Sequence, residues 1–235
     1  MSDLEQQQED HEENIGNPGF FTKIFFSDYN KLMKKGYKAP LEMSDLDNLT
    51  PDYKVEHLHS KFDINWIREK QSGRCSLFWA ISNTFGYKWY PSGFLKLIGD
   101  VAKFFSPFVF SKLIALISSG ENRSLGFGYC TIIYVLESIA SLFYNYYFKR
   151  VMIVGFCIRS ALMAAIYQKA LKLSPKSRQQ FGDGRIVNMI STDVARIDMV
   201  TGYLHYLWSA SLQITAASII LIFIFGWSAV VGLSF

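Results

Sequence analysis

The chain has 235 residues, of which half are hydrophobic and 16% aromatic, while only 19% are charged, against roughly 25% in average soluble proteins. Residues 1–92 hold 11 Lys or Arg and 14 Asp or Glu, and residues 93–235 hold 13 and 6, so the two parts carry net charges of −3 and +7. This composition excludes a purely soluble globule and a disordered chain.

The N-terminal end is acidic. Residues 1–13 contain six acids, no Lys or Arg and no apolar run, so they do not form a signal peptide. We interpret residues 1–16 as a disordered acidic tail that stays in the cytosol. The three cysteines form no C-x-x-C pair and the histidines lack partners at ligand spacing, so the sequence predicts no metal site and no cofactor in this chain.

Residues 17–92 are expected to form a cytosolic or interfacial unit. Asn17-Pro18 is a typical helix start, and Gly36 is placed to end the helix. Its apolar positions fall at helical spacing among four lysines: Phe21, Ile24, Phe25, Tyr29, Leu32 and Met33. This pattern favours a helix in the lipid headgroup region, and the alternative is a soluble amphipathic helix packed on a neighbour. Residues 37–92 then resemble a polar connector with one short helix, which begins at Ser60.

Residues 93–235 contain the predicted membrane spans. The first runs from about residue 94 to 119 and is followed by a very short turn at 120–124. The second crosses from about 125 to 148, and its apolar face continues to about 173. The 48 residues from Gly126 to Leu173 would measure ~72 Å as one helix, whereas a hydrocarbon core is ~30 Å thick. A continuous helix must therefore project far into water.

A loop with Gly182 and Gly184 precedes a predicted short helix over 185–198. One face of this helix carries apolar residues that would need a partner to cover them, and the whole candidate set is Ile186, Val187, Ile190, Asp193, Val194 and Ile197. The alternative is that this face packs only against neighbouring loops. Residues 199–235 contain no charge, and we expect a third span at about 203–225 and the start of a fourth from about 229. The fold class is therefore all-α and polytopic.

Three ionisable residues within the spans are candidates for a substrate path. Asp100 and Lys103 lie three residues apart on one helical face, and Glu137 is the only charge of the second crossing. Charges at membrane depth usually face a bundle interior or an aqueous cavity. The alternative for Asp100 and Lys103 is a mutual ion pair that reaches the cytoplasmic interface. Glu137 must be paired, protonated or exposed to water.

The loops predict an orientation. Residues 149–196 hold nine Lys or Arg against two acids, and positively charged loops stay cytoplasmic. The long loop and the N-terminus are therefore expected inside, and the turn at 120–125 outside. The same rule explains the basic loop without a nucleic-acid partner.

Motifs for catalysis are absent from the sequence. It contains no G-x-x-x-x-G-K-[ST] phosphate loop, no G-x-G-x-x-G after a strand and no H-E-x-x-H. We therefore do not expect this chain to be an enzyme or to bind ATP by itself.

The N-terminal motifs resemble a known family. Phe25-Phe-Ser27 with Asn30, then Lys34-Lys-Gly-Tyr-Lys38 and Pro40-Leu-Glu42 through Asp45-Leu46, are similar to the "lasso" of subfamily C ABC transporters, the multidrug-resistance-associated type. One departure is Asp28, because the family usually has Trp after the Ser.

Later motifs resemble the same family in the same order and spacing. Arg159-Ser-Ala-Leu and Ile166-Tyr-Gln-Lys-Ala-Leu-Lys-Leu-Ser174 look like its second membrane helix at the point where it enters the cytosol. Gly184-Arg-Ile-Val-Asn-Met-Ile-Ser-Thr-Asp193 looks like its first coupling helix, and Leu207-Trp-Ser-Ala with Leu212-Gln213 like the start of its third span.

The resemblance implies a partial ABC-exporter transmembrane domain with long cytosolic helix extensions. In the complete family, ATP and Mg²⁺ drive the export of organic anions, conjugates and xenobiotics, and a coupling helix docks on a nucleotide-binding domain. The expected partners are the bilayer, such a domain and further membrane helices. Because the chain ends inside an apolar segment, we expect a truncated or partial exporter, a fragment that is inactive alone. The alternative is a free-standing small multi-pass membrane protein that binds or modulates a partner.

Overall fold

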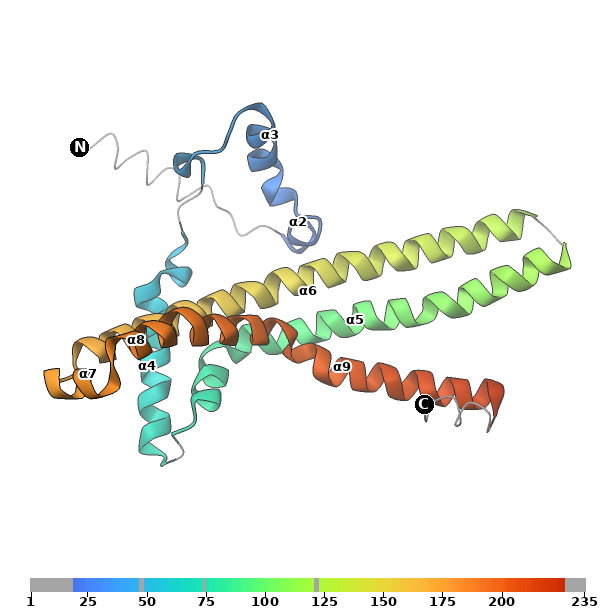
Figure 1. Cartoon of the computed structure of the whole chain (residues 1–235). Coiled ribbons are helices and arrows are strands. Elements are labelled where there is room, and N and C mark those ends of the chain that lie inside the picture. Colours follow the sequence, from blue (N-terminus) through green and yellow to red (C-terminus); the bar gives the residue numbers. More distant parts are fainter. Residues whose placement is uncertain (1–18, 47–48, 74, 121–122, 227–235) are drawn as a thin grey trace. The chain divides into compact units, whose positions relative to one another are not determined.

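The structure is a computed structural model that describes residues 19–46, 49–73, 75–120 and 123–226 (Figure 1). These residues form helices and turns, and no strand occurs among them. The chain divides into two compact units, residues 1–48 and 49–235. The predicted acidic tail and the predicted start of a fourth span lie outside the described residues.

The N-terminal unit contains two short helices instead of the single helix predicted from 17 to 36. Helix α2 spans Phe20–Ile24, and helix α3 spans Asn30–Lys38. The chain breaks between them at Phe26, whose backbone is left-handed with φ 55°, and a 3₁₀ turn at Ser27–Tyr29 follows. A left-handed residue cannot continue a right-handed helix. The prediction that Gly36 ends the helix is also wrong, because α3 continues to Lys38.

In the second unit, the connector predicted at residues 37–92 is largely helical. Helix α4 spans Val55–Gln71, so Ser60 lies inside it and does not cap it. Helix α5 spans Leu77–Ser119, and it therefore begins 17 residues before the first predicted span at 94. The added turns are stabilised by packing, since Ala80 and Phe85 are buried in the core of this unit. The sequence of residues 77–93 is polar and aromatic, so their burial in the tertiary structure could not be predicted from it.

Helix α6 spans Arg123–Leu171 without interruption and confirms the predicted long second helix. Its 49 residues correspond to ~74 Å, more than twice the ~30 Å thickness of a hydrocarbon core. Figure 1 shows α5 and α6 side by side as an antiparallel pair. Gly120, at φ 70°, ends α5 in the left-handed conformation that favours glycine.

The segment between the second and third spans differs from the prediction. Helix α7 spans Pro175–Phe181 and helix α8 spans Asp183–Asn188. A π-helical turn at Met189–Asp193 then leads directly into helix α9, Val194–Phe225. The predicted helix at 185–198 is therefore not a separate element, because no backbone break occurs before the third span. Residues 186–197 form the beginning of one long helical stretch.

Among the described residues, three helical stretches are long and apolar enough to cross a membrane: Leu77–Ser119, Ser124–Leu171 and Gly184–Phe223. This confirms an all-α polytopic membrane protein. The buried core lies where α4 packs against α5 and α6, and it extends to the start of α9 through Val194. Its largest contributions come from apolar side chains, among them Leu58, Phe62, Phe85, Val154, Ile158 and Leu162.

Candidate functional site

Helices α5 and α9 run in the same direction, and three levels of contact set their register. Trp89 Nε1 donates a hydrogen bond to the Thr201 carbonyl at 3.4 Å, His205 stacks on Trp89 with ring centroids 4.0 Å apart, and Lys96 contacts Ser209. Gly93 allows this close approach, because a Cβ there would lie only 2.7 Å from His205 Cε1. These contacts therefore join residues of α5 to residues 112 to 116 positions later in α9.

The buried His205 is held in one neutral tautomer. Its Nδ1 accepts a hydrogen bond from Trp208 Nε1 at 3.1 Å, so the proton must be on Nε2. Nε2 then donates to the Trp89 carbonyl oxygen at 3.2 Å. The ring thereby fixes the position of α9 against α5 at Trp89 and Gly93, on the N-terminal side of Lys96 and Asp100.

The centre of the site is an ion pair within α5. The Lys96 ammonium lies 2.7 Å and 3.0 Å from the two carboxylate oxygens of Asp100, one helical turn later. The side chains are only 2% and 12% exposed. Two charges are tolerated in a low-dielectric environment only when they compensate each other and their remaining hydrogen-bonding groups are used. The pair is therefore a neutral unit within a predicted membrane span.

Helix α9 completes this pair with polar groups. Ser209 Oγ accepts hydrogen bonds from Lys96 Nζ at 2.8 Å and from Gln213 Nε2 at 3.0 Å, and it donates to Asp100 Oδ2. One hydroxyl can make two acceptor bonds and one donor bond, so Ser209 is fully used. We call Lys96, Asp100, Ser209 and Gln213 the polar cluster.

An aromatic ring of α9 and one of α6 lie next to the lysine cations of α5. Lys96 Nζ lies 4.4 Å from the ring centroid of Tyr206, and Lys103 Nζ lies 5.1 Å from that of Tyr144. Such rings attract cations through their negative faces. Lys103 has no acidic partner among the described residues, so it is the uncompensated positive charge next to the polar cluster.

A cavity of about 240 Å³ opens beside the cluster between α5 and α9. Asp100, Ser209 and Gln213 are its polar lining, and the other lining residues are apolar: Leu97, Val101, Phe104, Phe105, Trp208, Leu212 and Ala216. An apolar cavity with a few convergent polar groups is the usual form of a small-molecule site.

The three residues predicted to line a substrate path do not all lie together in the structure. Asp100 belongs to the polar cluster, but its ion pair is with Lys96, so the alternative of an Asp100–Lys103 pair is wrong. Lys103 is adjacent, over the Tyr144 ring. Glu137 lies on the exposed surface of α6 and is not a member of the cluster.

Lys96 and Ser209 were missed by the sequence reasoning. Lys96 precedes Asp100 by four residues, a spacing at which helical side chains also meet, and this signal was available. The predicted span began at 94, only two residues before Lys96, whereas α5 begins at Leu77. Nothing in the sequence indicated that Ser209, 109 residues after Asp100, would contact it.

The apolar face predicted to need an external partner is partly covered by this chain. Val194 is 2% exposed and belongs to the core, and Ile197 packs against that core. Ile186 and Ile190 are half-buried, while Val187 and Asp193 are exposed. The covering comes mainly from α6, whose packing the sequence did not reveal. The Val194 end of this face therefore packs on the helical core of this chain, and not on neighbouring loops as the alternative had it.

Comparison with known proteins agrees with this architecture. Residues 89–235 match the family described as ABC transporter transmembrane region. The chain is 30% identical over 239 residues to "ABC transporter C family member 8" of Dictyostelium discoideum, which covers 99% of this chain and 15% of that protein.

Two further relatives have similar coverage. "Metal resistance protein YCF1" of Saccharomyces cerevisiae is 33% identical over 216 residues, 83% of this chain and 14% of the relative. "ATP-binding cassette sub-family C member 4" of Homo sapiens is 29% identical over 223 residues, which cover 91% of this chain and 17% of the relative. The chain thus spans between 14% and 17% of the length of these three relatives. The chain belongs to the family of ABC transporter transmembrane regions, and its type is that of subfamily C.

Proposed function

We propose that this chain supplies membrane helices of an ATP-driven exporter, that their cytosolic ends dock on a nucleotide-binding domain, and that it transports nothing without such a domain. The observation that carries the proposal is the length of α6. About 30 Å of its ~74 Å suffices to cross the hydrocarbon core, so ~40 Å of helix projects beyond it. Helices α7 and α8 lie at the end of that projection.

The tip formed by α7 and α8 suits a contact with a soluble domain. Val187 is 63% exposed, and a half-buried Ile186 lies beside it. Lipid cannot cover an apolar side chain that far from the bilayer, so a protein surface must. We place the docking surface at residues 175–188, because Val194 and Ile197 of the predicted coupling helix already pack within this chain.

The charges of the site support organic anions as the substrate class. Lys96 neutralises Asp100, which lines the 240 Å³ cavity, and the exposed Lys103 three residues later has no acidic partner among the described residues. An uncompensated positive charge raises the local concentration of anions. The apolar lining would bind the hydrophobic part of the same molecule.

The docking surface can be tested by site-specific photocrosslinking. A photoreactive amino acid replaces Val187 in one variant and Phe127 in the control, which is 74% exposed near the other end of α6. Each protein, in nanodiscs, is mixed with the nucleotide-binding domain of a C-type relative. We expect a crosslink at 187 and none at 127. Equal or absent crosslinking at 187, with normal insertion, would contradict the proposal and favour a free-standing protein with another partner.

A further inference from the structure

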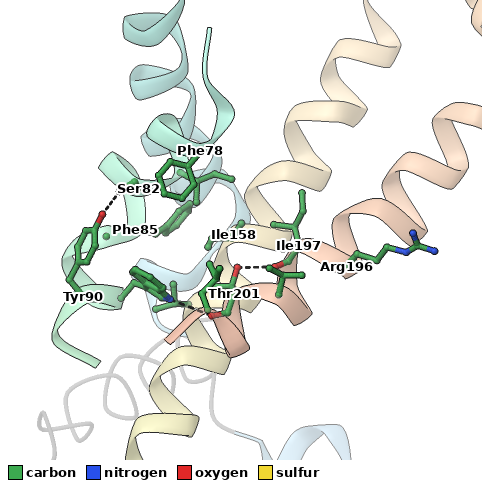
Figure 2. Close-up of a pocket in the computed structure, with 14 residues that line it drawn as sticks. Phe78, Ser82, Phe85, Tyr90, Ile158, Arg196, Ile197 and Thr201 are labelled. Carbon is green, nitrogen blue, oxygen red and sulfur yellow. Dashed lines mark hydrogen bonds between the residues drawn. The ribbon is translucent and has the colours of Figure 1, made fainter. Parts of the chain in front are cut away.

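A second, larger cavity of about 350 Å³ lies between α5, α6 and α9, toward the α8 end of the bundle (Figure 2). It is separate from the polar cluster and shares no lining residue with the 240 Å³ cavity. Its apolar wall comes from Phe78, Ile81, Phe85, Trp89, Val154, Ile158, Ile197, Val200 and Leu204.

The polar atoms of the wall are already paired within the protein. Ser82 Oγ and Tyr90 Oη share a hydrogen bond of 2.7 Å, and Thr201 Oγ1 donates to the Ile197 carbonyl at 2.8 Å. Trp89 Nε1 donates to the Thr201 carbonyl. Figure 2 shows these bonds along the wall. The wall is mainly apolar and its few polar side chains already bond within the protein, and this favours hydrocarbon over a polar molecule.

One charged residue stands at the edge of the cavity. Arg196 contributes to the lining, and its guanidinium is directed outward, away from the aromatic wall (Figure 2). The side chain is exposed and forms no ion pair with any acid in the part of the chain that the structure describes. This geometry, an apolar stem along the cavity and a free cation outside it, complements a molecule with a hydrocarbon tail and an anionic head.

The register of the helices orients such a molecule. Because α5 and α9 run parallel, Arg196 lies toward α8 and Leu204 lies about two turns deeper, ~12 Å along α9. Phe78, Tyr90 and Val200 at the rim are each more than half exposed, so the cavity opens at the surface of the bundle. Residues 149–196 are strongly basic, which predicts that this end is cytoplasmic, and the cytoplasmic leaflet is the anionic one.

We propose that this cavity binds one acyl chain of an anionic phospholipid from the cytoplasmic leaflet, with the lipid phosphate against Arg196. The bound chain fills the space between α5, α6 and α9 and joins the start of α9 to the aromatic segment of α5. The site is independent of the proposed transport activity, since it uses none of the polar cluster.

The full chain in nanodiscs tests the proposal with three probes that carry the same photoreactive acyl chain: phosphatidylserine, phosphatidylcholine and the free fatty acid. Labelled peptides are mapped by mass spectrometry. We expect phosphatidylserine to label 78–90 and 196–204 most strongly. Arg196→Gln should reduce its labelling about fivefold, to the level of phosphatidylcholine, which corresponds to the ~1 kcal/mol of one cation near an anionic surface. Lys172→Gln, in the same basic loop but outside the cavity, should have no such effect.

A second variant separates the cavity from ordinary contact with surrounding lipid. Val200→Trp places an indole at the exposed rim and should remove the labelling by filling the cavity, whereas Leu207→Trp, on the same helix and 71% exposed but outside the lining, should leave it unchanged. The proposal is overturned if the three probes label equally, if the fatty acid labels as strongly as phosphatidylserine, or if Val200→Trp has no effect.

Discussion

Lys96 is the residue on which the candidate site most depends. Its side chain is 2% exposed, and its ammonium donates hydrogen bonds to both Asp100 and Ser209. Burying an ion pair gives little net stability, but removing one partner leaves an uncompensated charge and typically costs 3–5 kcal/mol. We expect the cost of removing one partner to exceed the net stability of the pair by a large margin here, because the pair lies in a helix able to span a membrane.

The first prediction separates the role of Lys96 from that of Lys103. Lys96→Met should lower the free energy of unfolding by ~3–5 kcal/mol, since Asp100 loses its partner. Lys103→Met should lower it far less, because this lysine contacts a ring and no acid. In the proposed function, Lys103→Met should instead weaken the binding of a fluorescent organic anion. Stability is measured by SDS titration in detergent micelles, and binding by anisotropy.

The control for this prediction is the double variant Lys96→Met with Asp100→Asn. With both charges gone, it should recover more than half of the lost stability, because the amide can still hydrogen-bond to Ser209. A Lys96→Met protein as stable as the wild type would show that water reaches Asp100 and that the pair is not buried.

Gly155 illustrates a contact that is visible only in three dimensions. It lies where α6 meets the start of α9, and a Cβ there would fall 2.4 Å from Asp198 Oδ1. Asp198 also forms an ion pair of 3.8 Å with Arg159, one turn after Gly155. The glycine thus gives the carboxylate room to reach the arginine.

At the scale of elements, the N-terminal unit is held together by a polar contact. Lys35 on α3 donates a hydrogen bond to Asp45, which also accepts the Glu42 backbone N–H at 3.1 Å in a capping box. The hydrogen bond from Lys35 is the main cause that lowers the pKa of Asp45 below its ordinary value of 3.8, and the bond from the Glu42 N–H lowers it further. This carboxylate joins the 3₁₀ turn Met43–Asp45 to α3.

The second prediction concerns the pH dependence of this contact. Since the pKa of Asp45 is lower in the folded unit, folding favours the ionised form, and its contribution is present above pH ~3.8 and disappears as the pH falls through the folded pKa. In an NMR titration of carboxyl-labelled Asp, the midpoint of Asp45 should lie below 3.8. Lys35→Ala should raise it part of the way, because the bond from Glu42 persists. Lys38→Ala, also in the last turn of α3, should leave it unchanged, and an equal rise in both variants would contradict the assignment.

The continuous helical stretch from α8 into the start of α9 has two different surroundings. Its apolar residues at 186–197 follow a single helical period, yet Val194 is buried in the core while Val187 is exposed. The π-helical turn Met189–Asp193 lies between them, and it marks the change from the α8 tip to the packed bundle. A π-turn rotates the following residues relative to the preceding ones, so one sequence stripe is divided between two directions.

For the whole molecule, helix lengths and loop charges predict one orientation. Residues 149–196 carry nine Lys or Arg and two acids, and they include the far end of α6 and the α7–α8 tip. We therefore expect the tip and the N-terminus on the cytosolic side and residues 120–125 on the opposite side.

The third prediction tests this orientation in sealed microsomes, whose outer face corresponds to the cytosol. In a Cys75→Ser background, Lys176→Cys should react at once with a membrane-impermeant maleimide, whereas Ser124→Cys should react only after detergent is added. Two sequons provide an independent reading, Asn48-Leu-Thr50 inside and Asn122-Arg-Ser124 outside, although both asparagines lie outside the described residues. A sugar on Asn48, or the reverse order of labelling, would contradict the orientation.

Much of the fold could be predicted because apolar length and helical periodicity are local properties. The second span and its extension to about residue 173 agree with α6, which ends at Leu171, and the third predicted span ends with α9 at Phe225. The boundaries that failed, at 37, 94 and 185, lie where packing overrides local pattern. Residues 77–93 are polar enough to look like a connector, but α4 and α6 bury one side of them.

The candidate site was predictable in part for the same reason. Asp100 and Lys103 are visible as charges inside an apolar run, since each violates the composition around it. Their partners are not visible. Whether Asp100 contacts Lys96, Lys103 or a residue of another helix depends on the rotation of α5 about its axis, and α9 fixes that rotation through His205 and Ser209.

By itself, the sequence determined that this protein is helical, spans a membrane several times and resembles the transmembrane part of subfamily C transporters, because hydropathy, helical period and motif order are written along the chain. The tertiary structure alone decided which charges compensate each other, which part of the 186–197 face is covered, and where cavities remain. Those outcomes depend on the relative position of α5, α6 and α9, and contacts such as Lys96 with Ser209, 113 residues apart, arise only when these helices are packed together.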